Sequence, residues 1–154
     1  MGLTDKLALV AGGSRGIGKA IALDLAREGA DVAIAARNAE QLERTAAEIE
    51  DQTGRRAIPL VFDATSTEQS TNMVNDAAAQ LGGLHILVNS ASLPGGSPSA
   101  TGPVETVDEE DLLRDFDVKY VGALRCAKAA PTSRSRAGAG SSTSAALTHG
   151  GLAT

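Results

Sequence analysis

Cysteine and aromatic residues are scarce in this sequence of 154 residues. The single cysteine, Cys126, excludes a disulfide within the chain and any metal site built from several cysteines. Because Cys126 falls within a helical pattern, we expect it to be a small buried residue rather than a nucleophile. Tryptophan is absent and aromatic residues make up only 2% of the chain, so a core must be built from Ala, Val, Leu and Ile.

Basic surface and long apolar runs are lacking as well. The formal net charge of −5 gives no reason to expect nucleic acid or an anionic membrane as a partner. The longest apolar run is far shorter than the roughly 20 residues that cross a bilayer. The first residues, MGLTDKLALV, lack the basic and apolar regions of a secretory signal. We therefore expect a cytoplasmic location.

Short apolar runs alternate with helical patterns along the first part of the chain. The strands are predicted at 6–12, 31–37, 56–63 and 84–91, the first of them buried on both faces. The helices are predicted at 16–30, 38–54, 67–83 and 108–130, the last in two segments that meet near Asp117. This alternation predicts an α/β fold with a doubly wound parallel sheet and right-handed crossovers.

Two of the helical patterns carry expectations for single residues. In the first helix, Ile17, Ile21 and Leu25 should share one apolar face with several alanines. In the second helix, Asn38 is predicted to cap the start and Gly54 to end it.

The turn after the first predicted strand is rich in glycine, reading AGGSRGIG from Ala11 to Gly18. Gly12 allows a tight turn, and Gly16 lets backbone N–H groups approach a pyrophosphate. Gly18 permits close packing of the helix on the strand, and the helix N-terminus adds free N–H donors. A turn that merely happens to contain glycines is the alternative, but the flanking strand and helix favour a dinucleotide site.

The spacing Gly-x-x-x-Gly-x-Gly and three later motifs resemble the short-chain dehydrogenase/reductase family over residues 3 to about 130. The resemblance implies that Asp63, in VFDAT, accepts a hydrogen bond from the adenine amino group. The segment LVNSAS resembles the family's Asn-Asn-Ala-Gly motif and keeps Asn89 and Ala91. In DVKYVGAL, Lys119 stands where the family most often has a catalytic asparagine.

The family likeness implies a Rossmann-type fold, a nicotinamide dinucleotide partner, an alcohol or ketone substrate, and pairing of copies through helices near 108–130. No metal ligands are predicted, since the acidic run Asp108–Asp111 suits the first turn of a helix. His85, at the start of the fourth strand, is expected to be structural. The predicted cofactor-binding residues are Gly12, Ser14, Arg15, Gly16, Ile17, Gly18, Arg37, Asp63, Ala64, Asn89 and Ala91.

Charge at the end of the second strand predicts the cofactor. A carboxylate there would bind the ribose hydroxyls of NAD, whereas this chain has Ala35 and Ala36 followed by Arg37. Arg15 lies in the glycine turn, and two guanidinium groups suit a 2′-phosphate. We therefore predict NADP in preference to NAD. Two solvated surface arginines are the alternative.

The family's acid/base pair, a tyrosine followed four residues later by lysine, is missing. The single tyrosine is Tyr120, and position 124 is leucine. We therefore predict that residues 1–130 form an incomplete, C-terminally truncated NAD(P)-binding domain that binds a cofactor without catalysis. The alternatives are a non-catalytic dinucleotide-binding module or an inert product.

The last segment, residues 131–154, is rich in Ser, Gly and Ala and is expected to lack regular structure or to attach loosely. Reading its codons one base earlier permits Pro-His-Leu, a glycine-rich turn and Ile-Val-Asn-Ile-Ser-Ser. That order resembles the family's helix end, turn and fifth strand, so a frameshifted tail is our hypothesis. The competing interpretation keeps the frame and aligns Ser144 with the family's catalytic serine.

Overall fold

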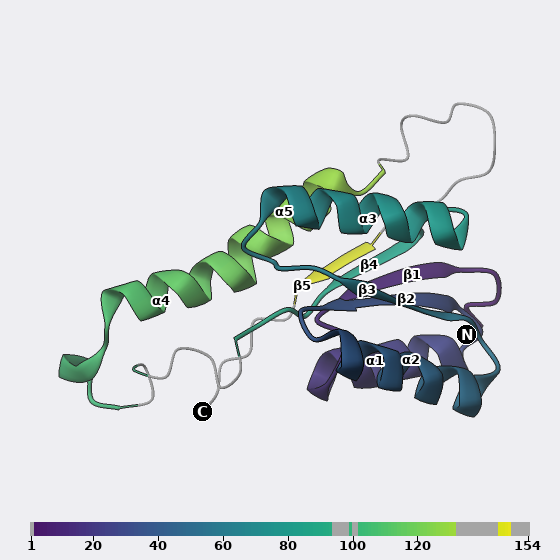
Figure 1. The fold of residues 1–154 in the computed structure, drawn as a ribbon, viewed down its shortest axis with the longest axis horizontal. Coiled ribbons are helices and arrows are strands. Elements are labelled where there is room, and N and C mark those ends of the chain that lie inside the picture. The colour runs from purple at the N-terminus through teal and green to yellow at the C-terminus, as the bar shows by residue number, and fades with distance from the viewer. Residues whose placement is uncertain (1, 94–98, 100–101, 132–144, 149–154) are drawn as a thin grey trace.

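The computed structural model describes residues 2–93, 99, 102–131 and 145–148, and it contains one parallel sheet with helices on both faces (Figure 1). The strands are β1 (Leu7–Ala11), β2 (Asp31–Ala36), β3 (Ala57–Val61), β4 (Ile86–Asn89) and β5 (Ala145–Thr148). The α-helices are α1 (Gly16–Arg27), α2 (Ala39–Thr53), α3 (Thr67–Leu81), α4 (Glu109–Phe116) and α5 (Gly122–Ala129). A 3₁₀ turn, η2 (Val104–Thr106), precedes α4, and a π-helical segment, η3 (Asp117–Val121), joins α4 to α5.

The strand order is β3-β2-β1-β4-β5, and every neighbouring pair is parallel. Helices α1 and α2 cover one face of the sheet, and α3 and α5 cover the other (Figure 1). This arrangement confirms the predicted doubly wound α/β fold. The order reverses between β1 and β4, and in such sheets ligands bind beyond the carboxyl ends of the strands at that point.

Strand β1 shows why its apolar run is continuous. Leu9 and Ala11 belong to the core between the sheet and α3 and α5, whereas Ala8 and Val10 belong to the core beneath α1 and α2. All four side chains are buried. Because successive side chains of a strand point to opposite faces, a strand covered on both sides needs an apolar residue at every position.

Local signals placed the ends of α2 correctly. The side chain of Asn38 accepts a hydrogen bond from the backbone N–H of Gln41 at 2.9 Å, as an N-cap does. Gly54 ends the helix in the left-handed conformation, with φ of 66°. Both predictions are confirmed.

The expected apolar face of α1 is partly wrong, since Ile17 is 56% exposed. The buried stripe of this helix runs through Gly18, Ala22 and Ala26, one position round from Ile17. Small residues occupy that stripe because the helix lies close to the sheet, so the larger side chains are displaced toward its sides.

The long helical pattern breaks where it was expected to. Helix α4 ends at Phe116, and the π-helical segment η3 begins at Asp117. The side chain of Asp108 accepts hydrogen bonds from the N–H groups of Glu110 and Asp111, so the acidic run starts the helix as predicted. Among the described residues, no cluster of three metal-binding side chains occurs, and no helix is long and apolar enough to cross a membrane.

A short strand, β5, forms where the sequence predicted no regular structure. Its backbone pairs in parallel with β4, with Ala145 opposite Ile86 and Thr148 opposite Asn89. The expectation is therefore wrong for these four residues. The backbone N–H and C=O groups along the edge of β4 can form hydrogen bonds with any extended segment, whatever the side chains of that segment. Ser144, His149 and most of the tail lie outside the described residues, so the frameshift and in-frame hypotheses stay predictions.

Candidate dinucleotide site

The predicted cofactor-binding residues follow four strands, β1 to β4, whose carboxyl ends meet at one edge of the sheet. The glycine turn after β1 is packed against the segment after β4. Gly12 has φ of 87°, and a Cβ there would lie 2.5 Å from the backbone of Ser90 and Ala91. A Cβ on Gly18 would lie 2.1 Å from the carbonyl oxygen of Gly12. Both positions therefore require glycine, for the turn and for the close approach of α1.

The outer side of the turn is open. A Cβ on Gly16 would have no heavy atom within 4 Å, and Ile17 beside it is exposed. The inner side is anchored, because the hydroxyl of Thr45 on α2 donates to the carbonyl oxygen of Ser14 at 2.9 Å, with both residues buried. A rigid backbone with an open face at a helix N-terminus suits a phosphate group.

Two arginines stand at this edge outside every ion pair of the described residues. Arg15 precedes α1 in an extended conformation, and Arg37 follows β2, whose end carries Ala35 and Ala36. Both arginine side chains are exposed, and neither forms an ion pair with any residue that the structure describes. Their exposed guanidinium groups can therefore bind an anion.

Asp63 lies just after β3, at the same edge. Its Oδ1 accepts from the backbone N–H of Thr65 at 2.9 Å and from the Thr65 hydroxyl at 2.8 Å. These hydrogen bonds hold the pKa of the Asp63 carboxyl below its usual value, and the charges of Arg37 and Arg114 lower it further. The carboxylate is thus ionised near neutral pH, with Oδ2 outside both of these bonds and able to accept from an amine.

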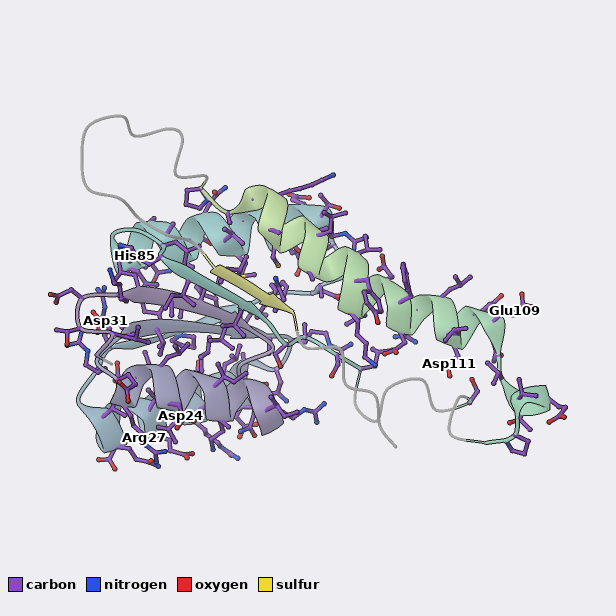
Figure 2. The ribbon with its side chains drawn as sticks, turned by 180° about the vertical axis from the view of Figure 1, so that it is seen from behind. Asp24, Arg27, Asp31, His85, Glu109 and Asp111 are labelled. Atoms are coloured by element: carbon purple, nitrogen blue, oxygen red, sulfur yellow. The ribbon has the colours of Figure 1, made fainter. Side chains whose placement is uncertain are left out.

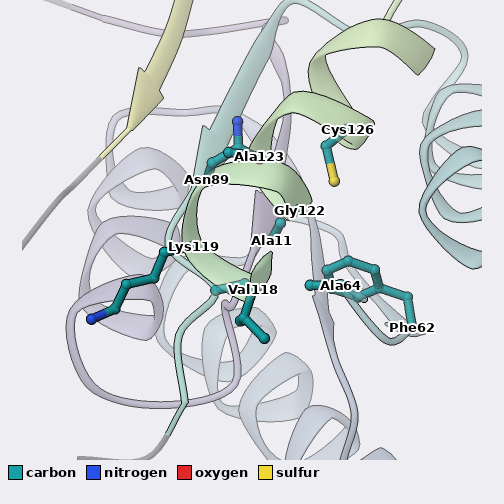
Figure 3. A pocket seen from close by; sticks show the side chains of 10 residues that line it. Ala11, Phe62, Ala64, Asn89, Val118, Lys119, Gly122, Ala123 and Cys126 are labelled. Carbon is teal, nitrogen blue, oxygen red and sulfur yellow. The ribbon is translucent and has the colours of Figure 1, made fainter. Parts of the chain in front are cut away.

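A small pocket lies beside the glycine turn, between the ends of the strands and the η3–α5 segment (Figure 3). It brings together three predicted site residues, Ala64, Asn89 and Ala91. Asn89 is buried, and its side-chain oxygen has no hydrogen-bond partner within the described structure. An unsatisfied buried oxygen is costly, and it marks a place where a ligand donor would be accommodated. The other lining residues are Ala11, Phe62, Val118, Lys119, Gly122, Ala123 and Cys126.

Comparison with known proteins identifies the family to which the chain belongs. Residues 6–141 match the family model described as short chain dehydrogenase. The chain belongs to the short-chain dehydrogenase family.

Related proteins extend beyond the chain's length. An uncharacterized oxidoreductase of Mycobacterium tuberculosis is 36% identical over 151 residues, which are 98% of this chain and 56% of that protein. A short chain dehydrogenase from Burkholderia cenocepacia, solved in complex with NADP, is 39% identical with a TM-score of 0.74. That alignment covers 83% of this chain and 50% of the solved one. The chain thus spans about half the length of these relatives.

L-sorbose reductase from Gluconobacter frateurii, solved with NADPH and L-sorbose, has a TM-score of 0.74 at 28% identity, over 84% of this chain and 48% of the reductase. The residues present here fit a nicotinamide dinucleotide by their own geometry. The glycine turn leaves room for a diphosphate, Arg15 and Arg37 form no ion pair among the described residues, and the side-chain oxygen of Asn89 has no hydrogen-bond partner there.

At the position where this family most often has asparagine, Lys119 is held by an acid on its own helix. Its ammonium group lies 2.8 Å from the carboxylate of Asp115, one helical turn earlier. Tyr120 is half exposed and stacks on Phe116, with ring centroids 4.8 Å apart. Tyr120 is also absent from the residues that line the pocket.

Two further expectations on side chains are confirmed. Cys126 is buried, and burial raises the pKa of its thiol to about 11, so it stays neutral and unreactive at physiological pH. His85 accepts a hydrogen bond at Nδ1 from the backbone N–H of Leu7 at 3.1 Å, which is a structural contact. Figure 2 shows His85 near Asp31, where the strands begin, at the end of the sheet away from α4.

Sequence reasoning missed Arg125 on α5, which fastens the helices to the site. Its guanidinium donates to the carbonyl oxygen of Ala64 at 2.8 Å, to the hydroxyl of Thr67 at 3.1 Å and to the carboxylate of Asp117 at 2.8 Å. Two of these partners are about sixty residues away in sequence, so no local pattern indicates them.

Proposed function

We propose that this chain is the dinucleotide-binding part of an NADP-preferring short-chain oxidoreductase that interconverts an alcohol and a ketone. The observation that carries the proposal is a pair of exposed arginines, Arg15 and Arg37, that form no ion pair among the described residues and flank an open glycine turn and a strand end without a carboxylate. A guanidinium binds phosphate oxygens in a bidentate manner, so this arrangement favours a 2′-phosphate over ribose hydroxyls.

Each predicted residue then has a role in binding. The backbone from Gly12 to Gly18 and the N-terminus of α1 hold the pyrophosphate. The carboxylate of Asp63 accepts a hydrogen bond from the adenine amino group, with Ala64 beside it. Asn89 and Ala91 border the part of the pocket nearest the sheet. When bound, the cofactor supplies or accepts a hydride. The NADP and NADPH found in the two related structures support this assignment.

We further propose that the chain as it stands binds the cofactor without turnover, as a dinucleotide-binding module. Its sequence contains no tyrosine followed four residues later by lysine, since Tyr120 is followed at that distance by Leu124. The geometry supports this, because Tyr120 is stacked on Phe116 rather than placed at the pocket. An inert product is the alternative, and it would bind no nucleotide.

The test is a fluorescence titration with NADPH and NADH, followed by a turnover assay with generic ketones. We expect the unaltered chain to bind NADPH more tightly than NADH and to show no turnover. The substitution Arg37→Asp should weaken NADPH binding far more than NADH binding, because it brings a carboxylate against the 2′-phosphate. Equal losses for both cofactors would refute the NADP assignment, and absence of any binding would favour the inert product.

We also propose a cytoplasmic protein whose copies associate through the helical arm, the segment from Asp108 to Ala130 that contains α4, η3 and α5. The outer side of this arm exposes large apolar residues, each at least 49% accessible. Contiguous apolar surface of this kind marks association sites in soluble proteins. The residues are Leu112, Leu113, Phe116, Tyr120 and Leu124.

A further inference from the structure

Arg114, on the last turn of α4, belongs to no motif that the sequence analysis singled out. We propose that Arg114 covers the face of the adenine ring and strengthens binding of NADPH and NADH alike; this rests on the proposed function. The side chain is exposed, and it forms no ion pair with any residue in the described part of the chain. Its guanidinium is therefore available to a ligand.

The helical geometry directs Arg114 toward the adenine end of the site. Val118 lines the pocket together with Ala64, the residue that follows Asp63 (Figure 3). Arg114 lies on the last turn of α4, four residues before Val118 on the π-helical segment η3, and residues four apart lie on roughly the same side of a continuous helix. The arm therefore presents, in order along one face, a pocket-lining valine and then a guanidinium.

Arg125 fixes the distance between this face and the loop after β3. It bonds both the carboxylate of Asp117 and the carbonyl oxygen of Ala64, at 2.8 Å each. Asp117 is three residues after Arg114, and Ala64 is next to Asp63. Arg125 therefore joins a near neighbour of Arg114 on the helix to the chain neighbour of Asp63.

Electrostatics agrees with this placement. The charges of Arg37 and Arg114 both lower the pKa of the Asp63 carboxyl. Arg37 follows β2, whereas Arg114 lies on the last turn of α4. Two arginines from different elements therefore act on the same carboxylate. Of the two, only Arg37 lies at the end of β2, where the proposed site would hold the ribose.

The chemistry separates the two arginines. An adenine whose amino group bonds Asp63 would lie beside the carboxylate on which Arg114 acts, and a planar guanidinium can stack on the flat face of an aromatic ring. Adenine is common to NADP and NAD, so this contact does not distinguish the two cofactors. Arg37, beside the ribose, carries the preference for the 2′-phosphate.

The experiment compares dissociation constants for NADPH and NADH in the unaltered chain and in Arg114→Ala, Arg37→Ala and Arg27→Ala variants. Arg27 is an exposed helix arginine at the opposite end of the molecule from α4, so its loss removes the same charge away from the site (Figure 2). We expect Arg114→Ala to weaken both cofactors about two- to fivefold, as for a stacked cation near the surface. Arg37→Ala should weaken NADPH selectively, and Arg27→Ala should weaken neither.

Each other outcome has a definite meaning. Unchanged affinities in Arg114→Ala, with normal binding by the unaltered chain, would overturn the role of Arg114 and leave the proposed function intact. A loss confined to NADPH would also overturn it, by making Arg114 a phosphate contact. If the unaltered chain binds neither cofactor, the proposed function fails and this inference fails with it. Urea denaturation of each variant, expected to match the unaltered chain because Arg114 is exposed, separates binding from folding.

Discussion

The glycine turn with its flanking strands and the helical arm from Asp108 to Ala130 are held in place in opposite ways. The first region is closed by contacts so short that no side chain fits, as at Gly12 and Gly18. The arm reaches past the edge of the sheet, and its outer side exposes large apolar residues such as Phe116 and Tyr120 (Figure 1). It is fastened to the rest of the molecule at a few buried or bonded positions, among them Val118 and Arg125.

The difference shows which parts of the site have a strictly fixed geometry. The turn that would hold a pyrophosphate is determined by close backbone contacts, and at Gly12 and Gly18 it tolerates no added volume. The arm that would meet the adenine is held by a few buried side chains and by the guanidinium of Arg125, which bridges distant segments. We therefore expect small changes to be severe in the turn and milder in the arm.

The largest effect is expected from Gly18→Ala, because the new methyl group would overlap the carbonyl oxygen of Gly12. The free energy of unfolding should fall by about 2–3 kcal/mol, as for an overpacked site, and NADPH should bind more than tenfold more weakly. Urea denaturation and fluorescence titration measure the two changes. The control Gly54→Ala strains a left-handed helix end with open space around it, so it should cost about 1 kcal/mol and leave binding unchanged. A Gly18→Ala variant as stable as the original would contradict the comparison.

The next effect is expected from Arg125→Ala, which removes the bridge between the arm and the loop after β3. Loss of hydrogen bonds to a partly buried charged group should lower the free energy of unfolding by about 1–2 kcal/mol. Binding of both cofactors should weaken as well, since the arm is no longer held against Ala64. Lys128→Ala, at an exposed position of the same helix, is the matched control and should change stability by less than about 0.5 kcal/mol. Equal behaviour of the two variants would show that Arg125 does not fasten the arm.

A smaller effect on stability, but a clear one on assembly, is expected from replacing Phe116 and Tyr120 together by serine. Both rings are 52% exposed, so the free energy of unfolding should change by less than about 1 kcal/mol. Copies that associate through this face should dissociate to monomers, which analytical ultracentrifugation detects. An unchanged assembly state would refute association through the arm.

The smallest effect is expected from the titration of Asp63. Its pKa is lower in the folded protein than in the unfolded chain, so ionisation stabilises the fold above the unfolded pKa of about 3.9. That contribution is lost as the pH falls through the lower, folded pKa. Asp63→Asn should therefore be slightly less stable than the original protein at pH 7, and this difference should disappear as the pH falls below the folded pKa of Asp63, as measured by urea denaturation. A difference that grows on acidification would show the opposite shift.

Features set by neighbours in sequence were predicted correctly, and Asn38, Gly54 and Asp108 show why. Each caps a helix end through backbone groups within four residues, so the sequence contains both partners of the contact. Ile17 was assigned wrongly because helical periodicity identifies an apolar side but not how closely that side approaches the sheet. Strand β5 was missed because pairing along an open edge uses backbone groups that every residue carries.

The sequence by itself determined the α/β alternation, the glycine turn and the residues that follow the strands. These depend on local periodicity, on the conformational freedom of glycine and on the rule that parallel strands end at one edge. Only the tertiary structure decided which residues of the helical arm lie beside the carboxyl ends of the strands. Arg125 meets Ala64 across sixty-one positions, and the charge of Arg114 acts on Asp63 although the two residues are distant in sequence. Contacts between distant segments depend on how the helices dock on the sheet, and no local pattern in the sequence specifies that docking.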